Sequence, residues 1–330
     1  MNQMTLADNR VKKFISKNSI WLILIVIVAV VTIIKPVFLT PGNLQTLITT
    51  ESIKGILAFG IMFAILSKGI DLTPGATVAF VSVICASLAQ TADASRKILG
   101  FGPLPGWLIF LIGIAIGAVI GLIIGAIIAY TKIPPFIATL GGQLILRAAS
   151  KMYSSIPVSS LSDDFRFFGK GDIFGIPMIV VIFVIMFIIS AILLTKTRFG
   201  RNVFAIGGND NAARVAGINV EKNLMLVYMW CSICAAIGGV LLAGRTGSAD
   251  PSTYGLNYEL DAIAAATVGG TSHTGGVCRI SGVLAGILIL GVINNALILM
   301  GVDDNMTNII KGLIIVGAVI LDMRKNAKKV

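Results

Sequence analysis

The polar stretch KTRFGRNVFAIGGNDNAARVAGINVEK, residues 196–222, is the longest polar run between two strongly apolar segments of the chain. The whole sequence of 330 residues is 56% hydrophobic and only 12% charged, whereas a soluble domain carries about 25% charged residues. Its apolar residues come in long unbroken runs, as helices that cross a membrane require. The sequence therefore predicts an all-α, polytopic helical membrane protein.

A short helix is predicted inside this polar stretch. Asn209 or Asp210 can serve as its N-cap, and residues 212–215 can form its first turns. Glycines mark both of its ends, and the stretch carries five basic residues against two acidic ones. Two explanations of such a loop stay open, namely the positive-inside rule alone or a docking site for another protein. The residues of that docking site would be Arg201, Gly207, Gly208, Asn209, Ala212, Ala213, Arg214 and Gly217.

The apolar runs predict about ten membrane-crossing helices. Their approximate bounds are 20–34, 53–67, 74–90, 107–130, 135–150, 176–194, 223–243, 259–270, 280–300 and 306–321. Residues 19–322 would then form one transmembrane domain with a polar loop at 195–222. A polar tail precedes this domain at 1–18, and a basic tail follows it at 323–330.

The distribution of charge predicts which side of the membrane each loop occupies. When the ten helices alternate in direction, the whole net charge of +11 falls on one side, while the other side and the spans balance. The positive-inside rule makes that side the cytoplasm and places both termini there. The same placement argues against nucleic acid as a partner, which a charge of +11 alone would suggest.

Two predicted spans are short. Residues 259–270 number only 12, or about 18 Å of helix, against a hydrocarbon core of about 30 Å. This span and residues 53–67 each run into a glycine-rich hairpin, GGTSHTGG at 269–276 and SKGIDLTPGAT at 67–77. Interrupted segments at matching places in two halves indicate broken helices that line a pathway. The alternative is that these boundaries are several residues off.

Four glycines recur at every fourth position within residues 107–130. They are Gly113, Gly117, Gly121 and Gly125. On a helix they form one smooth face where a neighbouring backbone can approach closely. The sequence predicts helix packing on this face, and the neighbour is either in the same chain or in a second copy.

Residues for enzyme or metal chemistry are scarce. The chain has no GxxxxGK[ST] loop to bind a nucleotide, and its single histidine, His273, falls in a glycine-rich turn. Cys231 and Cys234 form a CxxC motif inside an apolar span, where two small packing residues are expected rather than a zinc site or a disulfide. We therefore expect no catalytic residue, no metal and no cofactor.

Few ionisable residues occur in the predicted spans. Arg147 and Lys311 are two of them, and Glu259 and Asp261 lie at the outer end of another span. A secondary transporter usually carries carboxylates or histidines deep in the membrane. The driving energy is therefore expected to come from a partner protein.

Neutral amides also lie in the predicted spans, among them Gln143, Asn294 and Asn295. An amide in hydrocarbon needs a hydrogen-bond partner or a wet cavity. These three side chains either join helices or line a path for a solute, and a neutral amide suits an uncharged polyhydroxylated solute better than an ion.

The most specific motif, FGRNVFAIGGNDNAARVAGINV at 199–220, is similar to the cytoplasmic loop of permease subunits of bacterial sugar ABC importers, the ribose, galactose and xylose class. Nearly the whole chain resembles this family, and galactose/methyl-galactoside permeases look closest. Other matching stretches are FLTPGNL at 38–44, GIDLTPGA at 69–76, PPFIATLGG at 134–142, YELDAIAAATVGGTSHTGG at 258–276 and IIKGLIIVGAVILD at 309–322. Lys68 and Cys278 depart from the family pattern, in which glycine is common at these two places.

The resemblance implies a multi-pass permease of the bacterial inner membrane, surrounded by lipid and without catalysis of its own. Its partners would be a second permease copy or a related permease, two cytoplasmic ATP-binding subunits and a periplasmic sugar-binding protein. The loop helix would couple the ATPase to the spans. The alternatives are a self-sufficient secondary transporter or channel for a small polar solute, and a membrane-embedded enzyme, for which the chemistry above is missing.

Overall fold

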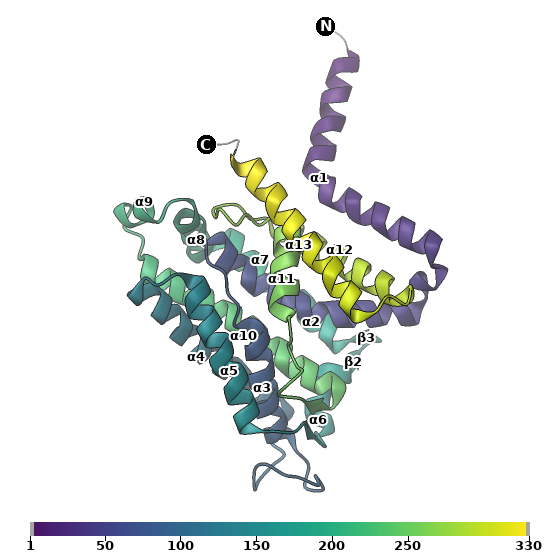
Figure 1. Ribbon diagram of the computed structural model, residues 1–330, viewed down its shortest axis with the longest axis vertical. Coiled ribbons are helices and arrows are strands. Elements are labelled where there is room, and N and C mark those ends of the chain that lie inside the picture. Colours follow the sequence, from purple (N-terminus) through teal and green to yellow (C-terminus); the bar gives the residue numbers. More distant parts are fainter. Residues whose placement is uncertain (1–2, 328–330) are drawn as a thin grey trace.

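A computed structural model describes residues 3–327, of which 3–18, 321 and 325–327 are described by their backbone alone, and this part of the chain is mainly helical (Figure 1). The α-helices are α1 (Gln3–Ile34), α2 (Pro41–Leu66), α3 (Pro74–Ala89), α4 (Gly106–Thr131), α5 (Pro135–Tyr153), α6 (Asp163–Lys170), α7 (Met178–Lys196), α8 (Arg198–Gly208), α9 (Asp210–Val215), α10 (Val220–Thr246), α11 (Tyr258–Val268), α12 (Ile280–Leu299) and α13 (Asp304–Ala327). A short 3-10 helix, η1 (Pro36–Leu39), joins α1 to α2.

Each of the ten apolar segments overlaps one helix of the described chain. Six helices there are long and apolar enough to cross a membrane, namely α2, α4, α7, α10, α12 and α13, the last over Asp304–Arg324. Shorter apolar helices cover Ser19–Ile34 and Pro74–Ala89. The chain is therefore an all-α polytopic membrane protein, while the count of ten spans and the side of each terminus stay predictions.

The boundaries of the two expected tails fall inside helices, because α1 starts at Gln3 and α13 continues to Ala327. The division into tails and one membrane domain stays a prediction. Residues 1–2 and 328–330 of these tails lie outside the described residues.

The prediction of a short span at 53–67 is wrong, because α2 has 26 residues and begins at Pro41. Its first half is polar, so a search for apolar runs misses it. Pro41 occupies the first helical position, which suits proline. Thr46 and Thr49 donate their hydroxyl protons to the carbonyls of Gly42 and Gln45 at 2.9 and 2.8 Å, so these side chains are satisfied within the helix.

α11 is short, as predicted, with 11 residues. Its loop to α12 and the turn from α2 to α3 correspond to the two glycine-rich hairpins. In the turn, one carboxylate oxygen of Asp71 accepts hydrogen bonds from the backbone N–H and the hydroxyl of Thr73, at 2.9 and 2.7 Å. This local turn ends directly at Pro74, the first residue of α3.

The interior is built around α10, which packs against α4, α3 and α2. α11 and α12 complete this layer, since both pack against α2. The largest fully buried side chains come mainly from α2, and they include Ile56, Phe59, Met62 and Phe63, while Tyr228 comes from α10. Most of the surface of α2 and α10 is thus covered by other helices.

Two short antiparallel pairs of strands lie in the connections between helices. β1 (Val158–Ser159) pairs antiparallel with β4 (Ser248–Ala249), which follows α10. β2 (Asp172–Ile173) and β3 (Ile176–Pro177) form a hairpin before α7. Between these strands α6 packs against α10, α4 and α7. Residues 158–177 are therefore ordered and pack against the helices.

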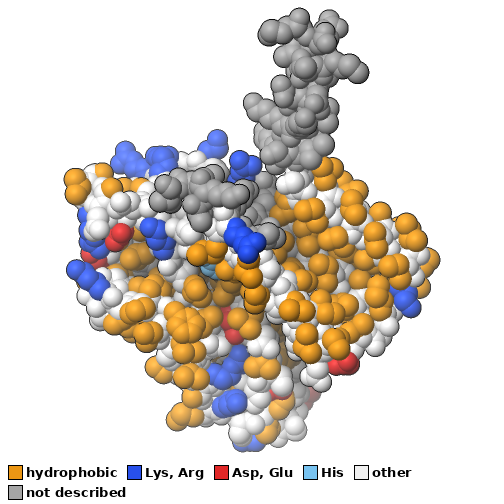
Figure 2. Space-filling view, turned by 45° about the horizontal axis from the view of Figure 1, so that its top comes forward, with side chains coloured by type: hydrophobic (Ala, Val, Ile, Leu, Met, Phe, Trp, Pro, Cys, Tyr) orange, Lys and Arg blue, Asp and Glu red, His pale blue; other side chains and the backbone are white. Residues whose placement is uncertain are grey.

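Hydrophobic side chains cover a broad flank of the molecule, and Lys and Arg side chains gather at the end that carries α8 and α9 (Figure 2). The exposed apolar residues lie on α1, α4, α5, α7 and α13, and they include Ile33, Ile123, Ile145, Ile185 and Leu313. A lipid bilayer is the environment in which such a surface is stable.

Candidate functional site

The polar stretch 196–222 folds into two helices, α8 and α9, where one was predicted. Thr197 caps α8, because its hydroxyl oxygen accepts a hydrogen bond from the backbone N–H of Gly200 at 3.2 Å. Asn209 caps α9 in the same way, accepting from Ala212 at 3.0 Å. The predicted cap at Asn209 is confirmed, and Gly207 and Gly208, which precede it, form the end of α8.

α9 is fastened to its neighbours. Ala213 is only 3% exposed and packs with Ile206 of α8 and Val220 of α10. Arg214 forms an ion pair with Glu221 in the first turn of α10. Gly217 follows α9 with a φ of +81°, a left-handed conformation that glycine adopts without strain. α8, α9 and the start of α10 thus form one small rigid unit.

The outer surface of this unit differs from the expected docking set in two residues, because Gly207 and Ala213 are both buried. Ala213, which was expected to help α9 enter a groove of a partner, faces the protein interior instead. Val215 is 91% exposed, and Ala212 and Ala216 beside it are exposed as well. Arg201 on α8 is also exposed. The free apolar surface of α9 therefore centres on Val215.

The predicted glycine face lies between α4 and α10 of the same chain. A Cβ added to Gly117 would stand 2.5 Å from the Cβ of Ala236 and 2.7 Å from the carbonyl oxygen of Ser232. One added to Gly125 would stand 2.7 Å from the Cα of Met225. Gly121, between these two, meets the backbone of the same helix, whereas Gly113 meets the side chains of Val240 on α10 and of Cys85 on α3. Helix α10 thus covers most of the face, with its backbone close to Gly121 and Gly125.

Asn295 is paired within the chain. Its amide exchanges two hydrogen bonds of 2.9 Å with the amide of Asn43, which joins α12 to α2. Asn43 also donates to the carbonyl oxygen of Phe38 at 2.8 Å. This reciprocal pair satisfies both amides, as the helix-joining explanation requires.

Gln143 and Asn294 lie in two different polar groups. Gln143 of α5 donates from Nε2 to a carboxylate oxygen of Glu259, at the start of α11, at 3.0 Å. The second carboxylate oxygen of Glu259 is buried and has no hydrogen-bond partner among the described residues. Beside them, Arg147 donates to the carbonyl oxygen of Tyr254 at 2.6 Å. Asn294 belongs to a group on the other side of α11.

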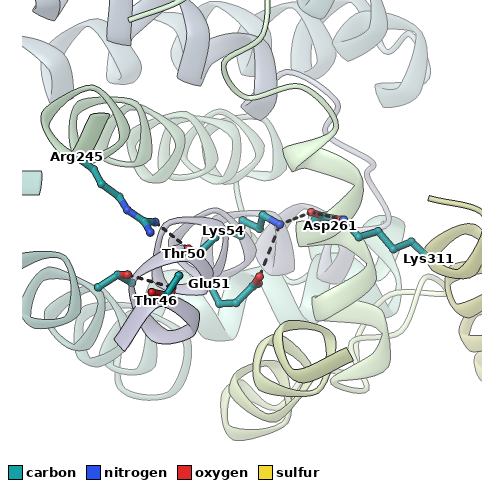
Figure 3. A network of polar contacts seen from close by, with 8 residues as sticks. Thr46, Thr50, Glu51, Lys54, Arg245, Asp261 and Lys311 are labelled. Carbon is teal, nitrogen blue, oxygen red and sulfur yellow. Dashed lines mark hydrogen bonds and ion pairs between the residues drawn. The ribbon is translucent and has the colours of Figure 1, made fainter. Parts of the chain in front are cut away.

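That other group is a largely buried charge network of four residues: Glu51 and Lys54 of α2, Asp261 of α11 and Lys311 of α13 (Figure 3). Lys54 Nζ lies 2.9 Å from Asp261 Oδ2 and 3.7 Å from Glu51 Oε1. Lys311 Nζ lies 3.1 Å from Asp261 Oδ1. Two positive and two negative groups meet here, so the network is neutral as a whole.

The charge network is closely packed. Glu51 rests on α12, where a Cβ added to Gly291 would stand 2.5 Å from its Cγ. Lys54 Nζ lies 5.6 Å from the centre of the Tyr258 ring, within the range of a cation–π contact. The cavity between Glu51, Lys54, Asp261 and Asn294 has a volume of about 10 Å³, too small for a sugar. Asn294 therefore borders a closely packed polar contact in this conformation.

The apolar pattern of the sequence does not reveal this network. The apolar run begins at residue 53, so Glu51 lies outside the predicted span and Lys54 lies at its very start. The signal was present, since an acid and a base three residues apart on a helix face the same side. Asp261 and Lys311 were noted separately, and no local pattern connects them with Lys54.

His273 and the cysteines are placed as predicted. His273 lies in the α11–α12 loop, with Nε2 2.8 Å from the hydroxyl of Thr267. Burial lowers the pKa of His273, and the carboxylate of Asp322 acts in the opposite direction. The four cysteines are free and buried. Within the described part of the chain, no three His, Cys, Asp or Glu side chains cluster as a metal site would require.

Comparison with known proteins places the chain among transport proteins. A family described as "Branched-chain amino acid transport system / permease component" matches residues 43–319. The galactose/methyl galactoside import permease protein MglC of Escherichia coli (strain K12) is 40% identical over 325 residues, 96% of each chain. The ribose import permease protein RbsC of Bacillus subtilis (strain 168) is 40% identical over 307 residues, 92% of each chain. No solved structure matches the chain.

Proposed function

Because this chain belongs to the family of branched-chain amino acid transport system permease components, we propose that it is the membrane-spanning subunit of an ABC importer for a monosaccharide. The observation that carries the proposal is similarity over nearly the full length to permeases named for galactose/methyl galactoside and for ribose. The chain is a permease and not an enzyme, so ATP is hydrolysed by a separate subunit. It is a multi-pass protein of the bacterial inner membrane.

The complete importer would contain two cytoplasmic ATP-binding subunits, a periplasmic sugar-binding protein and a second permease copy or a related permease. The ATP-binding subunit would bind α8 and α9, where Val215 is exposed beside Arg201. This site is supported by the two capped helices, whose anchoring to α10 through Ala213 and Arg214 lets the unit move as one piece. Lipid or the second permease copy would cover the exposed apolar faces of α4, α5 and α13.

The proposed topology has ten spans with both termini in the cytoplasm. It comprises a permease domain at 19–322 with its coupling loop at 195–222, flanked by the tails 1–18 and 323–330. Its support is the distribution of charge, since ten spans place the whole net charge of +11 on the cytoplasmic side. An odd number of spans would expose the basic C-terminal end to the periplasm.

Gln143 and Asn294 are the side chains that we assign to the solute path. Gln143 is supported by its place beside Glu259 and Arg147, where hydrogen-bonding groups converge next to the exposed face of α5. Asn294 is supported by the polar network around it, which would have to open before a solute could pass. The pairing of Asn295 with Asn43 favours a packing role for that residue instead.

The test is transport by the purified permease in proteoliposomes together with its ATP-binding subunits and binding protein. Labelled galactose, ribose and leucine are offered separately, with and without ATP. We expect ATP-dependent uptake of one of the two sugars and none of leucine. Uptake of leucine alone would replace the sugar by a branched-chain amino acid. Uptake without the ATP-binding subunits would favour the alternative, a secondary transporter or channel.

A further inference from the structure

Three segments that are distant in sequence meet at Gly207 through their backbones. These are the end of α8, the turn from α2 to α3, and the α11–α12 loop. The N–H of Gly276 donates to the carbonyl oxygen of Leu66 at 3.0 Å, which joins the turn to the loop. A Cβ added to Gly207 would overlap this same carbonyl oxygen and stand 2.7 Å from the nitrogen of Gly276. Only glycine fits between them.

Lys68 spans the same meeting point. Its Nζ donates to the carbonyl oxygen of Gly208 at 3.2 Å, and its side chain passes over Gly275, where an added Cβ would stand 2.5 Å from Cγ. The backbone of Lys68 has a φ of +64°, a left-handed conformation that is unfavourable for lysine. The turn thus places a long side chain where it ties the end of α8 to the α2–α3 connection.

The contacts continue beyond this point. The α11–α12 loop is bound to α13 by Asp322, whose Oδ2 accepts hydrogen bonds from the hydroxyl of Ser272 at 3.0 Å and from the N–H of His273 at 3.1 Å. The α2–α3 turn leads directly into α2 and α3. Gly207 is therefore linked, through the α2–α3 turn and the α11–α12 loop, to α2, α3, α11 and α12, and through Asp322 also to α13. None of these five helices adjoins the coupling loop in sequence.

The backbone contacts at Gly207 are stiff, unlike the contact that the Lys68 side chain makes. A contact through a long side chain can yield when that side chain changes rotamer, whereas two backbones in contact have no such freedom. Close-packed interiors pass displacement from one element to the next for this reason. Force applied to α8 also reaches the spans through α7 and α10, the helices joined to the coupling loop by the chain itself, and through the ring of Phe199, which stacks on Phe63 of α2 with 5.6 Å between the ring centres.

We propose that Leu66, Lys68, Gly207, Gly208, Gly275 and Gly276 form a mechanical junction that passes the movement of α8 and α9 to the α2–α3 turn and to the α11–α12 loop. This inference rests on the proposed function, in which an ATP-binding subunit moves α8 and α9. Gly207 and Lys68 are then positioning residues for coupling, since neither has to contact ATP or the solute.

Two glycines provide a matched test in the reconstituted importer. Gly207→Ala inserts a methyl group into the junction, whereas Gly317→Ala, on α13 and outside both the junction and the coupling loop, meets no other atom within 4 Å. We expect Gly207→Ala to bind the ATP-binding subunits and hydrolyse ATP, but to carry at least fivefold less solute per ATP than the parent. Gly317→Ala should keep the parent's ratio. Equal ratios for all three proteins would overturn the junction.

A second pair of variants decides the matter if Gly207→Ala does not fold. Lys68→Met removes the hydrogen bond to Gly208 and keeps the length of the side chain, while Lys68→Arg keeps a donor. We expect Lys68→Met to lower the ratio of solute to ATP and Lys68→Arg to restore most of it. The parent's ratio in Lys68→Met would overturn the role of Lys68, and with it the junction as defined.

A reversible bridge tests whether the segments move together. In Lys68→Cys/Gly208→Cys, a bifunctional methanethiosulfonate of about the length of a lysine side chain replaces the lost contact. We expect bridging to raise the ratio of solute to ATP towards the parent's and a reductant to cancel the gain. Inhibition by the bridge would show that the segments move apart during transport, against the junction. If the parent itself fails to transport with its ATP-binding subunits, the proposed function fails instead.

Discussion

Lys54 of α2 and Asp261 of α11 form an ion pair with a distance of 2.9 Å between Nζ and Oδ2, and both side chains are only 15% exposed. Glu51 and Lys311 complete a neutral network with them. A buried ion pair contributes little over a well-packed apolar pair, but removing one partner leaves a buried charge uncompensated. The contact between α2 and α11 therefore depends on the presence of all four charged side chains.

We predict that Lys54→Met destabilises the protein strongly. Asp261 and Glu51 would then share only Lys311, and breaking a buried pair costs about 3–5 kcal/mol. The measurement is the thermal unfolding midpoint of the purified protein in detergent. The double variant Glu51→Gln/Lys54→Met restores neutrality, so its midpoint should lie above that of Lys54→Met. A double variant no more stable than the single one would show that packing, and not charge balance, sets the cost.

Gly117→Ala is predicted to loosen the contact between α4 and α10, because its Cβ would stand 2.5 Å from the Cβ of Ala236. Overpacking of this kind costs about 1–3 kcal/mol. The matched control is Gly141→Ala on α5, where an added Cβ meets nothing within 4 Å. There alanine should be neutral or stabilising, since it favours the helix by about 1 kcal/mol over glycine. Equal unfolding midpoints for the two variants would contradict the close approach.

Asn295→Leu and Asn43→Leu should lower stability by similar amounts, because each leaves the other amide without its partner. The double variant should cost less than the sum of the two, with a coupling energy of about 0.6–1.7 kcal/mol. Unfolding of the four proteins of this cycle in detergent measures the coupling. If Asn295 instead serves the solute path, Asn295→Leu should impair transport while Asn43→Leu does not.

Ala213→Glu is predicted to detach α9 from α8 and α10, since it places a carboxylate among Ile206 and Val220. The membrane spans should still insert, but the ATP-binding subunits should bind weakly or hydrolyse ATP without transport. Val215→Glu is the complementary variant, because Val215 is 91% exposed and its replacement leaves the packing of α9 unchanged. A binding assay with the ATP-binding subunits measures both. Parent-like binding and transport by both variants would rule out α9 as the docking element.

A cysteine placed at Asn326 is predicted to be inaccessible from outside intact cells, because ten spans leave this end of the chain in the cytoplasm. The four native cysteines are buried, so they give little background. Labelling with an impermeant maleimide should therefore fail before permeabilisation and succeed after it. Efficient labelling of intact cells would require an odd number of spans.

The structure also shows which features neighbouring residues alone can predict and which they cannot. The cap at Asn209 and the short helix α11 could be predicted, because capping and helix length depend on neighbouring residues. The start of α2 could not, since its first half carries polar side chains that are satisfied within the helix or in pairs such as Asn43 with Asn295. The inward position of Ala213 depends on how α9 folds back onto α10, which the sequence pattern of α9 does not contain.

The sequence by itself determined the class of this protein, because long apolar runs are stable only where lipid or other helices surround them. It also determined the smooth face at Gly113, Gly117, Gly121 and Gly125, since spacing alone aligns these residues on a helix. Only the tertiary structure decided that α10 covers this face, that Lys54 meets Asp261, and that Gly207 fits against Leu66. Contacts between distant segments depend on the packing of all the helices at once, and no local pattern carries that information.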